Sequence, residues 1–456
     1  MVNKKYSSKF LVYSLLLLFI AGCKVGPNYK RPDIDTGKEF RFSGSSDSVS
    51  FANTSWTYVF RDTILQQLIW QGLSYNFDLR MAIERVNQAR SAFKITRAEI
   101  WPSIDASGTA AYQNQQTPPS GTVEYRDFYG TANLTWEIDI WGKLRRAKES
   151  ARADLLAQEA YRQSVYITLI ANIASGYFNL LEYRDELQIT LFNVTIREEA
   201  LALVKAKMIA GTVSGLVVAQ AEAELASLKT QIPSYESIIG SQENALRLLL
   251  GQLPGEIMEG DSIIQQINPA IVPTAGIPAS LITRRPDIIQ AEQQLVSANA
   301  QIGVARAYML PSLSITANIG YSNLGAGLIG SAIGNLVAPI FSWGKLKANV
   351  KKAQSYKEEI LLNYQKTIYT AIGEVANGIL SIDKRSEVVV QDKNLVAAAQ
   401  TAFDLSNMLF NAGYASYLDV IDAQRSLYDA QVELSNAQSD ELQAIVNLYL
   451  ALGGGW

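Results

Sequence analysis

The residue types in this chain limit the chemistry that it can perform. Among 456 residues there are 40 Lys plus Arg, 43 Asp plus Glu, a single Cys and no His. Without imidazole there is no Ser-His-Asp triad and no His-ligated metal, and one Cys cannot build a zinc site. We therefore predict no catalytic site, no metal site and no cofactor, with a Lys, carboxylate or Tyr enzyme left as an alternative. The net charge of −3 argues against nucleic acid as a partner.

The single cysteine lies where a lipid anchor would be attached. Residues 1–22 have a basic start and then an apolar run, which at about 11 residues is too short to span a bilayer. The ending Ile20-Ala21-Gly22-Cys23 resembles a bacterial lipobox. We expect 1–22 to be a lipoprotein signal peptide and Cys23 to carry covalent lipid, with 23–60 as a lipidated tether. Lys24 in place of Asp favours the outer membrane, and a plain secretory signal or short anchor is the alternative.

Two carboxylates near the C-terminus, Asp419 and Asp422, are three residues apart and would share one face of a helix. One interpretation is local: Ser416 with Asp419 resembles a capping box, and Asp422 with Arg425 is an ordinary i,i+3 ion pair. The other is a pore, where rings of carboxylates select cations. The residues alone leave both open, and one side chain could serve both purposes.

The sequence contains an internal duplication, which predicts a first repeat at 61–260 and a second at 261–456. Arg97-Ala98 recurs as Arg306-Ala307, 209 residues later, each followed by an aligned Pro-Ser. Farther along the offset becomes 202 residues, as in Trp141-Gly142-Lys143-Leu144 and Trp343-Gly344-Lys345-Leu346, Gly211 and Gly413, and Gly251 and Gly453.

Each repeat is predicted to contain a helix, two strands, a long helix, a turn and a return helix. The spacing of apolar residues predicts a helix over 78–100. The long helices, 144–210 and 345–412, contain no Pro, and at 1.5 Å per residue each would be about 100 Å long. The return helices are predicted over 214–250 and 416–452. Such lengths suit a coiled coil better than a compact core.

The predicted strands alternate strictly between apolar and polar residues, over 134–140 and 312–321. This pattern fits a soluble half-buried sheet, or membrane strands with lipid on one face and water on the other. Two strands per repeat give four per chain, and a membrane barrel needs at least eight because open edges leave backbone groups unpaired. A single chain therefore cannot close a barrel, whereas three copies supply twelve strands.

Several motifs resemble the outer membrane factors, the TolC-like and OprM-like ducts of tripartite efflux pumps. The most distinctive is Thr283-Arg284-Arg285-Pro286-Asp287-Ile288, followed by Gly303-Val304-Ala305 and Pro311-Ser312-Leu313. Val25-Gly26-Pro27-Asn28-Tyr29 matches the segment that follows the lipobox in the lipoprotein (NodT) branch.

The resemblance implies a mainly α fold with membrane β structure. Three chains would form a 12-stranded outer-membrane barrel, four strands from each, continued by an α-helical coiled-coil tunnel in the periplasm of a Gram-negative bacterium. The implied function is passive conduction of drugs or metals. The implied partners are two further copies of the chain, outer-membrane lipid, a periplasmic adaptor and an inner-membrane transporter of the RND type.

The resemblance also implies roles for residues at the two helical turns. Asp419 and Asp422 match the inward carboxylates that close the periplasmic end, and Phe410 stands where a Tyr can help to lock it. Ala415 replaces an Arg that often joins this lock. The turns themselves are expected to contact the adaptor through Gly211, Ser214, Gly413 and Ser416.

Three other functions remain open on the sequence. The exit duct of a type I protein-secretion system would have the same fold. A lipid-anchored coiled-coil scaffold or adhesin would have the long helices but no conductance, and the alternating strands argue against it. A hydrolase is the third, although no nucleophile–base pair is visible in the sequence.

Overall fold

The computed structural model describes residues 24–42, 51–117, 121–258, 260, 266–267, 275–323 and 327–454. The predicted signal peptide and Cys23 lie outside these residues. The chain divides into two compact units. The first contains the described residues up to Ile34 together with 84–160 and 289–366, and the second contains 35–83, 161–288 and 367–456. Each unit draws on both halves of the sequence, so the units are not the two repeats, whose boundaries stay a prediction.

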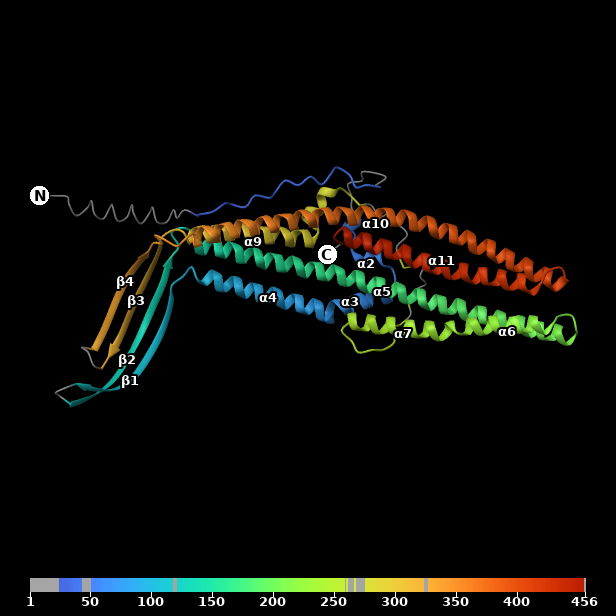
Figure 1. Ribbon diagram of the computed structural model, residues 1–456, viewed down its shortest axis with the longest axis horizontal. Coiled ribbons are helices and arrows are strands. Elements are labelled where there is room, and N and C mark those ends of the chain that lie inside the picture. The colour runs from blue at the N-terminus through green and yellow to red at the C-terminus, as the bar shows by residue number, and fades with distance from the viewer. Residues whose placement is uncertain are drawn as a thin grey trace. The chain divides into compact units, whose positions relative to one another are not determined.

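The order of elements agrees with the predicted repeat (Figure 1). The first repeat contains α4 (Phe77–Ala98), β1 (Ser103–Thr117), β2 (Gly121–Ile138), α5 (Lys143–Ile209), α6 (Gly215–Lys229) and α7 (Gln231–Leu249). The second contains α9 (Pro286–Ala307), β3 (Ser312–Ser322), β4 (Gly327–Val337), α10 (Lys345–Ala412) and α11 (Tyr417–Ala451). The shorter elements are η1 (Phe51–Asn53), α2 (Trp56–Val59), α3 (Thr63–Tyr75), η3 (Pro278–Ser280) and α8 (Leu281–Arg284).

The predicted return helix over 214–250 was wrong in one respect, because the structure divides it into α6 and α7 at Thr230. Pro233 explains the division. Its ring nitrogen carries no hydrogen, so it cannot donate to the carbonyl of Lys229 one turn earlier, and its ring disfavours a regular turn there. The corresponding helix of the second repeat has no Pro and is continuous from Tyr417 to Ala451.

Four helices end at glycines, and the duplication aligns these glycines with one another. Gly211, Gly413, Gly251 and Gly453 have φ angles of +74°, +81°, +69° and +86°. After each one the chain makes the paired backbone hydrogen bonds of a Schellman motif, such as Gly211 N–H to Met208 O at 2.9 Å. Both repeats therefore end their long helix and their return helix by the same backbone device.

The long helix α5 also carries the most apolar helical stretch that the structure describes. By length and composition this stretch could cross a membrane, but 56% of it is buried within the chain. Fully buried residues such as Ile173, Tyr177 and Phe178 lie along it. We therefore interpret it as a packed helix within the second unit.

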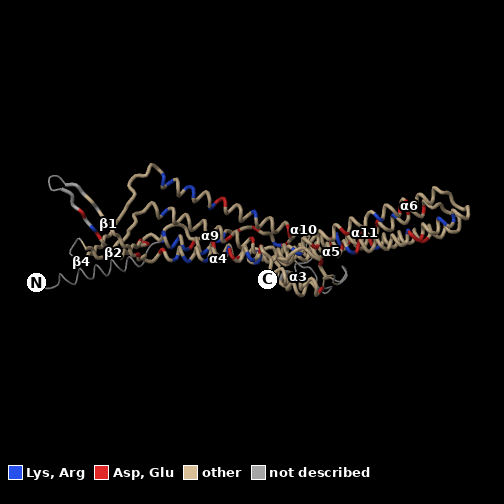
Figure 2. Tube along the Cα trace, turned by 90° about the horizontal axis from the view of Figure 1, so that it is seen from below, with Lys and Arg blue, Asp and Glu red and all other residues tan. Residues whose placement is uncertain are grey.

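The four strands form one antiparallel sheet in the order β1-β2-β3-β4, within the first unit. Its strands have 15, 18, 11 and 11 residues, all long enough to cross a bilayer at a tilt. β3 and β4 carry no charged residue, whereas Figure 2 shows charged residues along the hairpin of β1 and β2. β1 and β4 are the outer strands, so each has one edge without a partner among the described residues.

Candidate functional site

The two faces of the sheet differ in chemistry, and the strand register defines them because directly paired residues share a face. One face is apolar apart from a polar stretch near the β1–β2 turn that includes Asn114, Glu124 and Arg126, and it carries Ile104, Ala106, Leu134, Trp136, Ile138, Leu313, Ile315, Ile319, Leu328 and Leu336. Side chains of the outer strands are exposed in the chain, with Ile104 at 73%, Leu328 at 75% and Leu336 at 68%, and those of β2 and of the start of β3 are half-buried. A soluble half-buried sheet would cover this face, so the exposure favours membrane strands.

The opposite face of the sheet is mainly polar, although β4 adds Ile329, Ile333 and Val337 to it. Side chains there hydrogen-bond across strands, as Asn133 does to Asp105 at 3.1 Å, Ser107 to Thr131 at 2.9 Å and Ser331 to Asn318 at 3.2 Å. A face of hydroxyls, amides and carboxylates suits water. The alternation found in the sequence thus gives one face for lipid and one for an aqueous lumen.

Four tryptophans lie where the strands meet the helices. The indole N–H of Trp136 donates to Ile100 O at 3.0 Å, and that of Trp141 donates to Pro311 O at 2.7 Å. Trp101 and Trp343 are 71% and 90% exposed. The first pair therefore packs the junction, whereas the second pair is free to lie in a membrane interface, as aromatic belts do.

The segment that follows Cys23 is fastened to this junction. Val25 N–H donates to Trp141 O at 3.0 Å. The side chain of Arg146, 1% exposed, donates to the carbonyl oxygens of Val25 at 3.1 Å and Gly26 at 2.9 Å. Gly26 packs against Gly303, where an added Cβ would lie 2.5 Å from the Cα of Gly303. Two motifs noticed separately in the sequence are therefore in direct contact.

A second fastening follows along the same segment. Arg31 donates from Nε and Nη2 to the two carboxylate oxygens of Glu292, both at 2.7 Å. Tyr29 donates to the same carboxylate at 3.1 Å. Glu292 is buried on α9 and Arg31 is about half exposed, and this two-pronged ion pair fastens the tether to α9.

The turns after α5 and α10 lie close together within the second unit, as Figure 1 shows. Ser214 begins α6 without a side-chain cap, whereas Ser416 begins α11 with a complete capping box. Large apolar side chains stand exposed beside both turns, with Ile209 at 85%, Leu216 at 66% and Tyr414 at 84%. Such exposed apolar groups mark an interaction surface.

Asp419 and Asp422 make the local contacts that the sequence suggested. The backbone N–H of Ser416 donates to Asp419 Oδ2 at 2.8 Å, and Asp419 N–H donates to Ser416 Oγ at 3.3 Å. Hydrogen bonds from the hydroxyl and the backbone of Ser416 lower the pKa of Asp419, so it stays ionised. Arg425 Nη1 lies 3.6 Å from Asp422 Oδ1. Both carboxylates are exposed in the chain, and a pore-facing role for them stays a prediction.

Phe410 is placed differently from the two carboxylates, because its side chain is buried. Its ring lies 5.3 Å from that of Tyr417, and Lys207 Nζ lies 4.1 Å from its centre. It belongs to an apolar cluster that joins all four helices at the tip, with Val204, Val218, Ala221, Val420 and Ile421. Phe410 can therefore act on a gate only by packing the two hairpins together.

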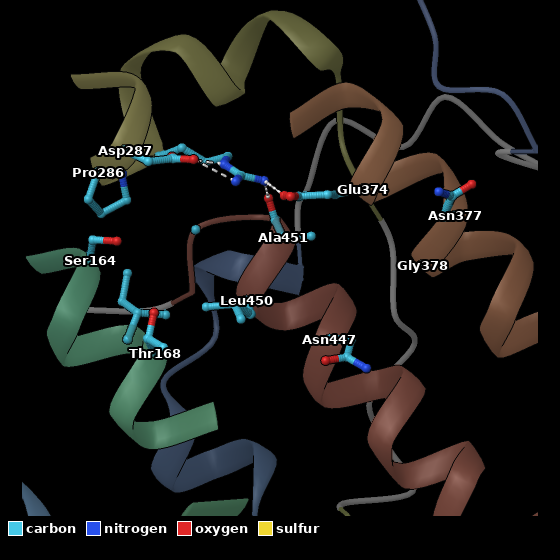
Figure 3. A pocket seen from close by; sticks show the side chains of 13 residues that line it. Ser164, Thr168, Pro286, Asp287, Glu374, Asn377, Gly378, Asn447, Leu450 and Ala451 are labelled. Atoms are coloured by element: carbon cyan, nitrogen blue, oxygen red, sulfur yellow. Dashed lines mark hydrogen bonds and ion pairs between the residues drawn. The ribbon is translucent and has the colours of Figure 1, made fainter. Parts of the chain in front are cut away.

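The Arg-Arg-Pro-Asp motif builds a polar site at the start of α9 (Figure 3). Arg285 donates to Asp287 at 3.0 and 2.7 Å, to Glu374 at 2.7 Å and to the backbone oxygen of Ala451 at 2.8 Å. These groups border a cavity of about 470 Å³ that Ser164, Thr168, Asn377 and Asn447 also line. In the sequence this motif indicates only a family resemblance, and nothing there predicts the contacts of its side chains.

Comparison with known proteins identifies the family. The chain matches the family described as "Outer membrane efflux protein" over residues 68–252 and 277–454. It belongs to this family.

Relatives of this efflux protein span nearly its whole length. The toluene efflux pump outer membrane protein TtgI of Pseudomonas putida is 34% identical, with 96% of this chain and 97% of the relative covered. The cation efflux system protein CusC of Escherichia coli K12 is 28% identical, over 96% and 97% of the two chains.

Solved structures agree with this assignment. The outer-membrane channel OprN superposes with a TM-score of 0.88 at 27% identity, over 95% of this chain and all of its own. The open-state outer membrane channel MtrE of Neisseria gonorrhoeae superposes with a TM-score of 0.86 at 26% identity, over 95% and 98%.

The efflux protein is thus an outer-membrane channel built from long helices and a membrane sheet, and the predicted family, fold class and location are confirmed. Membership also argues against the coiled-coil scaffold, which would not need the exposed apolar sheet. The predicted residues Asp419, Asp422, Phe410, Gly211, Ser214, Gly413 and Ser416 all lie at one tip of the second unit.

Proposed function

We propose that three copies of this chain form the exit duct of a tripartite efflux system. The carrying observation is the sheet, whose apolar face exposes large side chains such as Ile104 and Leu328 and whose outer strands β1 and β4 each have one edge unpaired by any described residue. In lipid an unpaired strand edge is very costly, so neighbouring copies must pair with it. Three copies would close twelve strands, and the 67-residue α5 with the 68-residue α10 would extend the tunnel by about 100 Å.

The channel would carry substrates passively from an inner-membrane transporter of the RND type through a periplasmic adaptor. The turns at Gly211 and Gly413 present exposed Ile209, Leu216 and Tyr414, an apolar surface suited to the adaptor. Ser214 and Ser416 would lie at its margin. Names of relatives refer to efflux of toluene and of cations, which favours efflux over a type I protein-secretion duct.

A covalent lipid on Cys23 would anchor the tether. Lys24, the next residue, packs against Gly142 at the strand–helix junction, where an added Cβ on Gly142 would lie 3.1 Å from Lys24 Cα. Acyl chains starting one residue earlier would then enter the membrane leaflet next to this junction. A relative that is 30% identical is named a probable outer membrane lipoprotein, SilC of Salmonella typhimurium.

In the trimer, Asp419 and Asp422 would form two rings of three carboxylates at the closed end of the tunnel. Each ring would attract cations and narrow the passage. Phe410 would support the rings by keeping the hairpins packed.

Measurement of mass in mild detergent and of conductance in planar bilayers tests the proposal. We expect a trimer with low cation-selective conductance, raised when Asp419 and Asp422 are both replaced by Ala. A monomeric particle, or no conductance even from the double variant, would contradict the duct.

A further inference from the structure

A large cavity lies among the helices next to the sheet, within the first unit. Its volume is about 620 Å³, which is in the range that holds a small organic molecule. Thr96 and Glu99 border it from the end of α4, Asp154 from α5, Tyr308 from the end of α9 and Tyr356 from α10. All four helices that join the sheet therefore contribute to it, and we call it the four-helix cavity.

Contacts link the four-helix cavity to the mainly polar face of the sheet. Glu137 lies four residues after Asn133 on β2, so both side chains are on that face. Lys143 Nζ donates to Glu137 Oε2 at 2.7 Å and lies 5.1 Å from the centre of the Tyr308 ring. Tyr308 in turn lines the cavity. The cavity is thus on the same side of the chain as the face that suits water.

The order of the helices indicates the same side. α4 leads into β1, α5 follows β2, α9 leads into β3 and α10 follows β4, so the helices leave the sheet in the order of its strands. Helices that follow one another round a tunnel can border a single cavity only on the side toward which the ring curves. In the proposed trimer that side is the inside of the tunnel, next to the barrel.

The lining combines a floor of small side chains with two aromatic rings. The floor is made by Ala147, Ala151, Val304, Ala305 and Ala353. The side chains of Tyr308 and Tyr356 are 56% and 45% exposed, so their rings are accessible to a molecule in the cavity. Open aromatic rings stack on flat ring systems and attract cations. The lining therefore suits a flat aromatic molecule.

The charges in the cavity favour a ligand with one positive charge. Two carboxylates, Glu99 and Asp154, and one ammonium group, Lys352, border it, which leaves one negative charge in excess. Desolvation raises the pKa of the Asp154 carboxyl, although a hydrogen bond with Ser297 opposes this effect. A carboxylate that is kept partly from water interacts more strongly with a cation than one in bulk solvent.

We propose that the four-helix cavity binds flat aromatic monocations, with Asp154 pairing the positive charge and with Tyr308 and Tyr356 packing against the rings. The inference rests on the proposed duct for its place on the path of transport, whereas the binding itself does not require conduction. Three copies of the chain would place three such sites round the tunnel.

The test is the fluorescence anisotropy of rhodamine 6G, a flat aromatic monocation, titrated with the full-length protein in a neutral detergent. We expect saturable binding. Fluorescein has the same ring system but a negative charge, so it should bind at least tenfold more weakly. Saturation that detergent micelles reproduce without protein, or equal binding of the two dyes, would overturn the inference.

Asp154→Asn keeps the shape of the side chain and removes its charge, so we expect rhodamine 6G to bind about tenfold more weakly. Glu159→Gln is the matched control. Glu159 is on the same helix but about 140° farther round it, where it lies 3.8 Å from Arg90 on α4. This variant should bind the dye like the wild type. Equal binding by Asp154→Asn and Glu159→Gln would contradict a site at Asp154.

Lys352→Gln should change the affinity in the opposite direction. It removes the positive charge from the lining, so rhodamine 6G should bind about threefold more tightly. A variant that only damaged the fold would not gain affinity. Tyr356→Leu keeps an apolar side chain and removes the ring, so it should weaken binding about threefold. Weaker binding by Lys352→Gln would overturn the inference.

Recordings in planar bilayers separate this inference from the proposed function. In the joint Ala variant of Asp419 and Asp422, rhodamine 6G should reduce the current, and adding Asp154→Asn should relieve this block. If the channel conducts but the dye neither binds nor blocks, the site fails although the duct stands. If the dye binds as expected and no variant conducts, the site stands and the duct fails.

Discussion

The guanidinium of Arg285 donates a 2.8 Å hydrogen bond to the backbone oxygen of Ala451, the last residue of α11. The first repeat has an equivalent contact, since Asn76 Nδ2 donates to the backbone oxygen of Leu249, the last residue of α7, at 2.9 Å. The donors are 209 residues apart and the acceptors 202, which are the two offsets of the duplication. Both repeats therefore tie the end of the return helix to the start of the first helix.

The Arg285 contact should be sensitive to shape as well as charge. Arg285→Lys keeps the positive charge but loses the planar fork that serves Asp287, Glu374 and Ala451 together. We expect a loss of roughly 2 kcal/mol in the free energy of unfolding, since hydrogen bonds to charged groups are worth about 1.5–3 kcal/mol. Thermal unfolding in detergent measures it. Asn76→Ala, which removes a neutral donor, should cost less, and the reverse order would contradict this explanation.

The features of this structure that could be predicted from the sequence are those determined by neighbouring residues. The ends of the long helices were predicted to within a residue or two, because a helix continues where Pro is absent and ends at a nearby Gly. The interior of Ser214–Leu250 was misjudged where Pro233 outweighed the surrounding helix formers. The ion pair between Glu224 on α6 and Arg425 on α11 could not be foreseen, because no spacing links two residues that are 201 positions apart. The burial of Phe410 likewise depends on packing between two hairpins.

Two of the aligned glycines should differ sharply in their tolerance of a side chain. At Gly251 an added Cβ would lie 2.4 Å from the backbone oxygen of Tyr75, whereas at Gly211 it would meet nothing within 4 Å. Both have positive φ, so Ala costs about 1 kcal/mol of backbone strain at either site. Gly251→Ala should add a clash and lower the unfolding temperature clearly more than Gly211→Ala. Equal melting temperatures would show that the chain at Tyr75 shifts easily.

Attachment of the lipid should depend on the sulfur atom of Cys23. Cys23→Ser removes the only thiol in the chain, so we expect the acyl mass and the incorporation of labelled palmitate to disappear. The Arg146 contacts with Val25 and Gly26 use backbone oxygens and do not need the lipid. An unchanged lipid signal in the Ser variant would rule out lipidation at Cys23.

Glu186 should make stability fall as the pH rises. Burial, followed by the nearby charges of Glu182 and Asp185, raises its pKa from 4.5 to about 7. The amide of Asn436 bridges Glu182 and Glu186 at 2.9 and 2.8 Å, and Tyr235 on α7 also faces Glu186. Because the folded chain holds this proton more tightly than the unfolded chain, stability is highest below about pH 4.5 and declines towards pH 7.

The neutral variant Glu186→Gln isolates this contribution from those of other acids. It should be more stable than the wild type at pH 8, and the difference should shrink as the pH falls towards 4.5. Unfolding midpoints at a series of pH values measure it. A difference that stays constant with pH would mean that Glu186 does not titrate in this window.

The local and the pore interpretations of Asp419 and Asp422 predict different responses. Ser416→Ala removes the hydroxyl of the capping box and leaves both charges, so it should weaken the start of α11 by about 1 kcal/mol without changing ion selectivity. Asp422→Asn leaves the capping box intact and removes a charge that is 63% exposed. If the carboxylates form rings, Asp422→Asn should lower the preference for cations in reversal-potential measurements. If selectivity instead follows Ser416→Ala, the two carboxylates act through helix capping and the pore role is wrong.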